Sequence, residues 1–230
     1  MKEKTLKKMI ALLPMKGYSE RVANKNMKNF NGTPLYHAIM NSLLASKYIE
    51  YIVIDTDSEV IAKDAKKHFG EKVLIINRPL EIQGSEVSMN LIINYDLAQL
   101  DSQHFLQTHS TNPLLKSDTI DQAIETYFSN LNLYDSVFGV TKVQTRFYDK
   151  DANAINHNPE ELLRTQDLEP LYEENSNFYI FSKESFKNAG NKRIGIKPKI
   201  FEVNKLEAID IDEPEDFILA ELLYKNRGMV

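Results

Sequence analysis

The sequence predicts an α/β protein, a Rossmann-like, doubly wound and mostly parallel sheet with a small inserted lobe. Short apolar runs of strand length alternate with amphipathic stretches of helical period. The expected strands are separated by enough chain for right-handed helical crossovers, which implies parallel pairing. With 230 residues, the chain can bury a sizeable core within a single domain over residues 1–230.

The elements are expected in the following order. The first strands are short apolar runs, at Met9–Leu13, Tyr51–Ile54, Val73–Ile76, Phe105–Thr108 and Val137–Val140. Helices with one apolar face are expected between them, at Pro34–Ser46, Glu59–His68, Val87–Leu97 and Asp118–Ser129. After the lobe come three further expected strands and a closing helix, at Phe178–Phe181, Lys199–Val203, Ala208–Ile211 and Glu213–Asn226.

The lobe is expected at residues 142–175. Lys142–Asn175 is polar, rich in Asn, Asp and Glu, and lacks a clean helical period. This break in the alternation of strands and helices indicates an insertion into the domain.

Composition excludes several classes of function. A formal net charge of -5, with cations scattered among acids, argues against nucleic-acid and membrane partners. The chain has no cysteine, so disulfides, thiolate catalysis and cysteine metal sites are excluded. No apolar run approaches the ~20 residues that span a bilayer, and the N-terminal run ends at Pro14 without a signal-peptide cleavage site. A cytoplasmic enzyme is the simplest interpretation.

A basic loop follows the first expected strand, at the edge of the sheet where such folds bind ligands. The loop contains Pro14, Lys16, Gly17, Ser19, Arg21, Lys25 and Asn26. Backbone N–H groups at a strand-to-helix turn, reinforced by Lys and Arg, can bind phosphate oxygens. Neither GxxxxGK[ST] nor GxGxxG occurs, which disfavours ordinary ATPases and dinucleotide binders. The alternative is a solvated basic turn.

An acidic segment precedes the closing helix. Strand alternation would place Asp210 and Asp212 on one face, where two carboxylates can share a hard cation such as Mg²⁺. Asp212 is alternatively a good helix N-cap, since Pro214 and Glu215 follow it as in a first helical turn. Capping and metal binding do not exclude each other.

Other polar residues follow expected strands and carry less specific signals. The turn Asp55-Thr56-Asp57 could bind a ribose or a metal, or cap a helix. Arg78 could bring a fixed charge to phosphates or form a surface ion pair. His109 could face a substrate or be a structural histidine.

These motifs together resemble the acylneuraminate cytidylyltransferases, the CMP-sialic acid synthetase type. The basic loop matches that family at Pro14, Gly17, Ser19, Arg21, Lys25 and Asn26, whereas Lys16, Tyr18 and Ala23 depart from its pattern. Further similar segments follow in the family's order, at Asn77–Leu80 with Ser85 and Ser88, Leu106–Leu114, Arg164–Leu168, Asn175–Ile180 and Ala208–Asp212. The resemblance covers nearly the whole chain.

The resemblance implies a cytidylyltransferase that joins CMP from CTP to a sialic-acid-like sugar acid, releases pyrophosphate and serves cell-surface polysaccharide biosynthesis. It implies nucleotide contacts at Pro14, Lys16, Gly17, Ser19, Lys25, Asn26, Arg78 and Ser88, with Lys16, Arg21, Lys25 and Asp212 as catalytic residues. Asp210 and Asp212 would hold Mg²⁺, with Mn²⁺ as an alternative. The sugar acid would meet His109, Thr111, Arg146, Arg164, Gln166 and Tyr179. The lobe would form a homodimer contact.

Two alternatives stay open. A nucleotide-sugar-dependent glycosyltransferase would use Asp55 and Asp57 as its metal-binding acids. A non-catalytic CTP-binding homologue would explain the departures at Lys16, Ala23 and His109.

Overall fold

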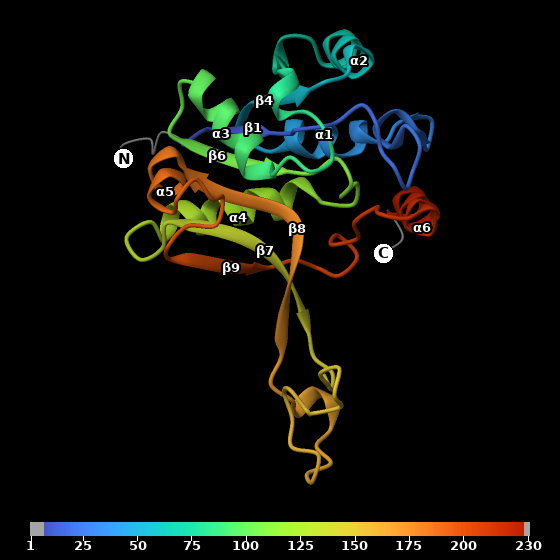
Figure 1. Cartoon of the computed structure of the whole chain (residues 1–230), viewed down its shortest axis with the longest axis vertical. Helices are drawn as coiled ribbons and strands as arrows, with labels where there is room; N and C mark the ends of the chain where they lie inside the picture. Colours follow the sequence, from blue (N-terminus) through green and yellow to red (C-terminus); the bar gives the residue numbers. More distant parts are fainter. Residues whose placement is uncertain (1–6, 228–230) are drawn as a thin grey trace.

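The computed structural model describes residues 7–227, which form a seven-stranded sheet covered by helices (Figure 1). The strands of this sheet are β1 (Met9–Leu12), β4 (Ile49–Thr56), β5 (Val73–Asn77), β6 (His104–Thr108), β7 (Ser136–Val143), β8 (Leu171–Ser182) and β9 (Pro198–Glu202). The helices are α1 (Tyr36–Ala45), α2 (Glu59–Phe69), α3 (Met89–Gln99), α4 (Ser117–Ser129), α5 (Lys183–Asn188) and α6 (Pro214–Lys225). A short hairpin pairs β2 (Asn29–Phe30) with β3 (Thr33–Pro34).

The strand order is β5-β4-β1-β6-β8-β7-β9. Neighbours pair in parallel except at β8, which runs antiparallel to both β6 and β7. The predicted α/β class with a mostly parallel sheet is therefore confirmed. Boundaries shifted by a few residues; for example, the first long helix begins at Tyr36 because Pro34 belongs to the β2-β3 hairpin.

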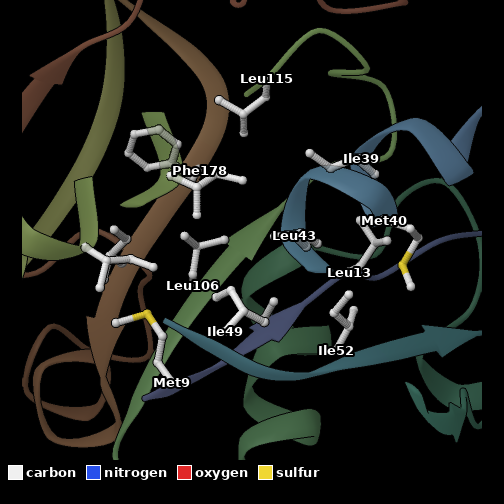
Figure 2. Close-up of a cluster of buried hydrophobic side chains, with 14 of the residues drawn as sticks. Met9, Leu13, Ile39, Met40, Leu43, Ile49, Ile52, Leu106, Leu115 and Phe178 are labelled. Atoms are coloured by element: carbon white, nitrogen blue, oxygen red, sulfur yellow. The ribbon is translucent and has the colours of Figure 1, made fainter. Parts of the chain in front are cut away.

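The two faces of the sheet are buried in separate clusters, as the alternation of side chains along a strand requires. Met9 and Ala11 of β1 face the cluster covered by α1, α2 and α4, while Ile10 and Leu12 face the cluster covered by α3 and α5. Figure 2 shows part of the first cluster, in which side chains of α1 meet Leu106 of β6 and Phe178 of β8. Because both faces are buried, the sheet is a rigid support for the loops at its edges.

The segment before α6 corrects two predictions. Ala208–Ile211 is not a strand: its residues form a turn and irregular chain, and Ile211 N–H donates to Thr111 O at 2.9 Å. Asp212 is not the N-cap of α6, because Glu213 takes that position in a reciprocal cap with Asp216, and Pro214 is the first helical residue. This irregular segment lets α6 pack next to the basic loop, where Phe217 contacts Val22 and Phe30.

The predicted insertion has the form of a long arm that projects from the sheet (Figure 1). It is formed by the outer halves of β7 and β8, which pair from Val140 with Glu174 to Val143 with Leu171, and by the chain between them. The predicted lobe at residues 142–175 therefore begins and ends inside paired strands. Within residues 7–227, no helix combines the length and apolarity needed to cross a membrane.

Candidate functional site

A cleft of about 230 Å³ lies beyond the carboxyl ends of β1 and β6. It brings together nine residues that the sequence singled out: Pro14, Lys16, Ser19, Lys25, Asn26, Arg78, Ser85, His109 and Thr111. An apolar wall completes it, from Met15, Val87, Met89 and Ile92. This wall was not predicted, because apolar residues next to a strand or in a helix such as α3 carry no signal that separates a binding wall from core.

Four hydrogen bonds hold the basic loop at the mouth of the cleft. Met15 N–H donates to Asp55 O at 2.8 Å, which continues the sheet beyond β1. Gly17 N–H donates to Asp57 Oδ1 at 2.6 Å. Asn26 donates from Nδ2 to Lys16 O at 2.9 Å and accepts from Ser110 Oγ at 2.6 Å. The loop is thus preorganised by its neighbours.

Gly17 occupies a position where a side chain does not fit. A Cβ at Gly17 would lie 2.9 Å from Ser58 Cβ, closer than such atoms approach, and Ser58 caps α2. If the loop binds CTP, as the resemblance implies, Gly17→Ala should displace the loop and weaken that binding by about tenfold, equivalent to about 1.4 kcal/mol. Calorimetric titration with CTP measures the change in affinity. Unchanged affinity in Gly17→Ala would contradict the role given to the loop.

Basic and acidic segments meet beside the cleft. The Arg21 guanidinium pairs with Asp212 at 2.7 Å and with Glu213 at 3.0 Å, on the surface. Lys25 is nearly buried; its ammonium donates to Ile211 O and lies 3.8 Å from Asp212. Burial lowers the pKa of Lys25, while Asp212 and Asp210 act against that shift. The acidic segment thus pairs with two cations of the loop, Arg21 and Lys25.

Asp210 is an unusual carboxylate within this segment. Its Oδ1 is buried and has no hydrogen-bond partner. Burial raises its pKa, as does the nearby Asp212, whereas a hydrogen bond from Thr111 lowers it. An orphaned carboxylate oxygen next to a second carboxylate is a donor set that suits a hard cation such as Mg²⁺. The residues present therefore fit the predicted metal site.

Arg78 is held by a buried pair of carboxyl groups. Its Nε donates to Asp55 Oδ1 and its Nη2 to Asp55 O at 3.2 Å, and both side chains are almost fully buried. Asp96 of α3 lies against this pair and is 1% exposed. Burial and the neighbouring Asp55 raise the pKa of Asp96 to about 9, so Asp96 is protonated at neutral pH and can donate its proton to Asp55. No sequence motif pointed to Asp96, which is a lone acid in a helix.

The raised pKa of Asp96 makes stability depend on pH. Between the ordinary aspartate pKa near 4 and about 9, the folded chain holds a proton that the unfolded chain releases. The free energy of unfolding should therefore fall as pH rises through this window, by at most about 1.4 kcal/mol per pH unit. Asp96→Asn removes the titration and keeps a donor for Asp55. Denaturant unfolding at several pH values should show a flatter profile for Asp96→Asn, and parallel profiles would contradict the assignment.

A second buried network lies at the other end of the cleft. Arg193 Nη1 donates to Gln107 Oε1 at 2.8 Å and lies 3.3 Å from His109 Nε2. Gln107 Nε2 is 3.2 Å from the same His109 atom, so two donors face Nε2 and the ring proton sits on Nδ1. Burial, and then the charge of Arg193, lower the pKa of His109 to about 3. His109 therefore presents a neutral imidazole, and Arg193 is a residue that sequence motifs missed.

Several predicted residues lie outside the cleft. Tyr179 is fully buried in β8, with the Arg193 guanidinium 3.6 Å from its ring centroid and its hydroxyl bonded to Glu174. Ser88 caps α3. The other three, Arg146, Arg164 and Gln166, are on the arm. Arg146 donates to Leu163 O, and Arg164 pairs with Asp167 at 2.7 Å. The backbone oxygen of Gln166 accepts from Gln144 at 2.9 Å.

The turn Asp55-Thr56-Asp57 does not offer two free acids. Asp55 is committed to Arg78 and Asp57 to the Gly17 amide. This arrangement disfavours the glycosyltransferase alternative, which needs both carboxylates for a metal.

A family model described as cytidylyltransferase matches residues 10–230. The fold and the cation-lined cleft define an α/β nucleotidyltransferase. More narrowly, the chain belongs to the cytidylyltransferase family, as the resemblance in its motifs predicted.

Similar proteins come from both sequence and structure. The chain is 26% identical to the pseudaminic acid cytidylyltransferase of Campylobacter jejuni serotype O:2, over 95% of this chain and 97% of that protein. It is 28% identical to the CMP-N,N'-diacetyllegionaminic acid synthase of Legionella pneumophila, over 94% and 96%. Among solved structures, CMP:2-keto-3-deoxy-manno-octonic acid synthetase complexed with CTP has a TM-score of 0.71 at 12% identity, over 96% and 99%. At that identity the last similarity supports the fold alone.

Proposed function

We propose that this protein transfers CMP from CTP to a nonulosonic sugar acid of the sialic acid type and releases pyrophosphate. The observation that carries the proposal is the convergence of Lys16, Lys25 and Arg78 on one cleft, close to the buried carboxylate of Asp210. Three cations suit a triphosphate, and the carboxylates of Asp210 and Asp212 suit a cation that accompanies it. The names of the Campylobacter and Legionella relatives support the class of acceptor.

The chemistry needs positioning and charge compensation more than covalent catalysis. The hydroxyl of the acceptor attacks the α-phosphorus of CTP and releases its proton to water, while the bond from the α-phosphorus to the oxygen that bridges to the β-phosphorus breaks and pyrophosphate leaves. Lys16, Lys25 and Arg78 would hold the phosphates in line and compensate their charge, while Arg21 would hold Asp212 in place. Mg²⁺ held by Asp210 and Asp212, when bound, supplies further charge compensation and lowers the pKa of the attacking hydroxyl.

The acceptor would occupy the end of the cleft formed by His109 and Thr111. His109 stays neutral across the physiological pH range because its pKa is near 3, so it would orient the sugar acid by hydrogen bonding without titrating. The carboxylate of the sugar acid suits the planar guanidinium of Arg146 or Arg164. Both arginines lie on the arm that projects away from the sheet, so we propose that they reach the cleft of a second copy (Figure 1).

Exposed apolar side chains on the arm support a homodimer. Leu162 is 93% exposed, Ile155 57% and Tyr148 52%, an arrangement that costs free energy unless something covers it. Light scattering at working concentration tests this, and a monomer would remove the cross-subunit arginines from the proposal.

The decisive experiment is a pyrophosphate-release assay. The protein is incubated with CTP, Mg²⁺ and a panel that includes pseudaminic, legionaminic and N-acetylneuraminic acids, with ATP, GTP and UTP as nucleotide controls. Release with CTP and one sugar acid would support the proposal and name the acceptor. If CTP binds in calorimetry but no acceptor yields pyrophosphate, the chain is a non-catalytic nucleotide binder and the proposal is wrong.

A further inference from the structure

A second cluster of metal-binding side chains lies between α1 and α2, apart from the residues that line the cleft. It consists of His37 of α1 with Asp64 and His68 of α2. His37 Nε2 lies 2.7 Å from Asp64 Oδ2, and His68 Nδ1 lies 3.1 Å from Asp64 Oδ1. One ligand atom from each residue lies within 4.8 Å of the others, and within residues 7–227 no other His, Asp and Glu side chains gather in this way.

The donor set points to a particular class of ion. Two imidazole nitrogens and one carboxylate oxygen suit Zn²⁺ and neighbouring transition metals, whereas Mg²⁺ and Ca²⁺ prefer sites made of oxygen alone. Asp64 and His68 are four residues apart in α2, so both side chains lie on one face of the helix. Both imidazoles place a nitrogen against the Asp64 carboxylate, and His68 Nδ1 also lies 3.0 Å from the backbone carbonyl oxygen of Asp64. An ion would replace the protons that these hydrogen bonds need.

Neighbouring side chains hold the candidate metal ligands in place. The Tyr36 hydroxyl donates to Asp64 Oδ2, and burial raises the pKa of Tyr36, so this donor stays neutral. A hydrogen bond to a metal-binding side chain fixes the orientation of that side chain. The ring of Phe69 packs at 4.8 Å from that of His37 and closes one side.

One side of the cluster stays open to solvent. The His37 side chain is 7% exposed and that of Asp64 17%, but that of His68 is 43% exposed. A hydrated ion can therefore enter past His68. Three protein ligands and an open fourth position would complete a tetrahedral site with one water.

We propose that His37, Asp64 and His68 form a site for a divalent transition metal, Zn²⁺ in the first instance, that links α1 to α2. The site is separate from the nucleotide cleft and does not depend on the proposed function. Its role is structural, because α1 and α2 pack on one face of the sheet and a bound ion would tie them together.

The test is titration of the full-length, tag-free protein with Zn²⁺, and with Co²⁺ as a spectroscopic probe. We expect one ion per chain with micromolar or tighter affinity, visible Co²⁺ d–d absorption, and a higher thermal unfolding midpoint with Zn²⁺. His68→Ala should weaken binding about 10 to 100-fold. His68 is exposed, so this variant should fold.

His157→Ala is the matched control, because His157 sits on the arm, bonded to Tyr148 rather than to other metal ligands. It should bind Zn²⁺ as the unmodified protein does. Binding that is absent, or equal in His68→Ala and the unmodified protein, would show that the cluster is only a hydrogen-bonded network. Pyrophosphate release is expected to be unchanged in His68→Ala, so failure of this proposal and failure of the proposed function remain distinguishable.

Discussion

Replacing Asp210 with asparagine is expected to lower the turnover number about 100-fold or more while the protein stays folded. Its Oδ1 is buried without a partner and Asp212 lies nearby, so the proposed Mg²⁺ would compensate both carboxylates. Metal-ion compensation of transition-state charge contributes several kcal/mol, and about 3 kcal/mol already corresponds to roughly 100-fold in rate. Pyrophosphate release at saturating CTP and acceptor, measured across a range of Mg²⁺ concentrations, gives both turnover and metal dependence.

Glu215→Gln provides a matched control for this experiment. Glu215 is an exposed acid of the same segment, in the first turn of α6, and it does not line the cleft. Its replacement should leave turnover and Mg²⁺ dependence unchanged. If Asp210→Asn behaves in the same way as Glu215→Gln, the metal assignment to Asp210 and Asp212 is wrong.

Replacing Arg78 with methionine is expected to lower the free energy of unfolding by about 3–5 kcal/mol. Removal of the guanidinium leaves the Asp55 carboxylate fully buried with no opposite charge, next to Asp96. An uncompensated buried charge costs far more than the loss of an exposed ion pair. Urea unfolding at neutral pH measures the difference.

Two further variants separate charge from packing at this site. Asp55→Asn combined with Arg78→Met removes the buried charge and should recover part of the lost stability. Arg21→Met removes a guanidinium whose pairs with Asp212 and Glu213 are half exposed, and should cost less than about 1 kcal/mol. Equal losses in Arg78→Met and Arg21→Met would mean that burial of the Arg78 pair has no energetic consequence.

Most of the fold was predictable from the sequence, because buried parallel strands and one-sided helices leave strong periodic signals. The strand predicted at Ala208–Ile211 shows where this signal fails. Its alternation of apolar and acidic residues is typical of a strand, yet contacts with Lys25 and Thr111 hold the segment in an irregular course. The local pattern thus predicted the wrong conformation for this segment, and the metal-binding role of Asp210 and Asp212 stays a prediction.

The site was predictable where residues are close in the sequence, and less so where the fold brings distant residues together. The basic loop is one continuous segment, so its cations could be recognised and the cleft contains them. Asp96 lies on α3 and Arg193 on the chain before β9. Each acts through a partner far away in the sequence, Asp55 for Asp96 and Gln107 for Arg193. Both separations exceed roughly 15 positions, the scale beyond which local patterns carry no information. The roles of Arg146, Arg164 and Gln166 stay predictions.

The antiparallel direction of β8 places the arm where its length and sequence can vary without disturbing the core. Since β7 runs parallel to β6 and β8 returns antiparallel, the chain that joins β7 to β8 emerges at the same edge of the sheet as the cleft. Lengthening a surface connection costs little free energy, about 0.6 kcal/mol for each doubling of its length. The arm can therefore change length and sequence during evolution while the core keeps its packing. Under the proposed function, Arg146 and Arg164 would be the part of acceptor recognition that can vary in this way, because both lie on the arm.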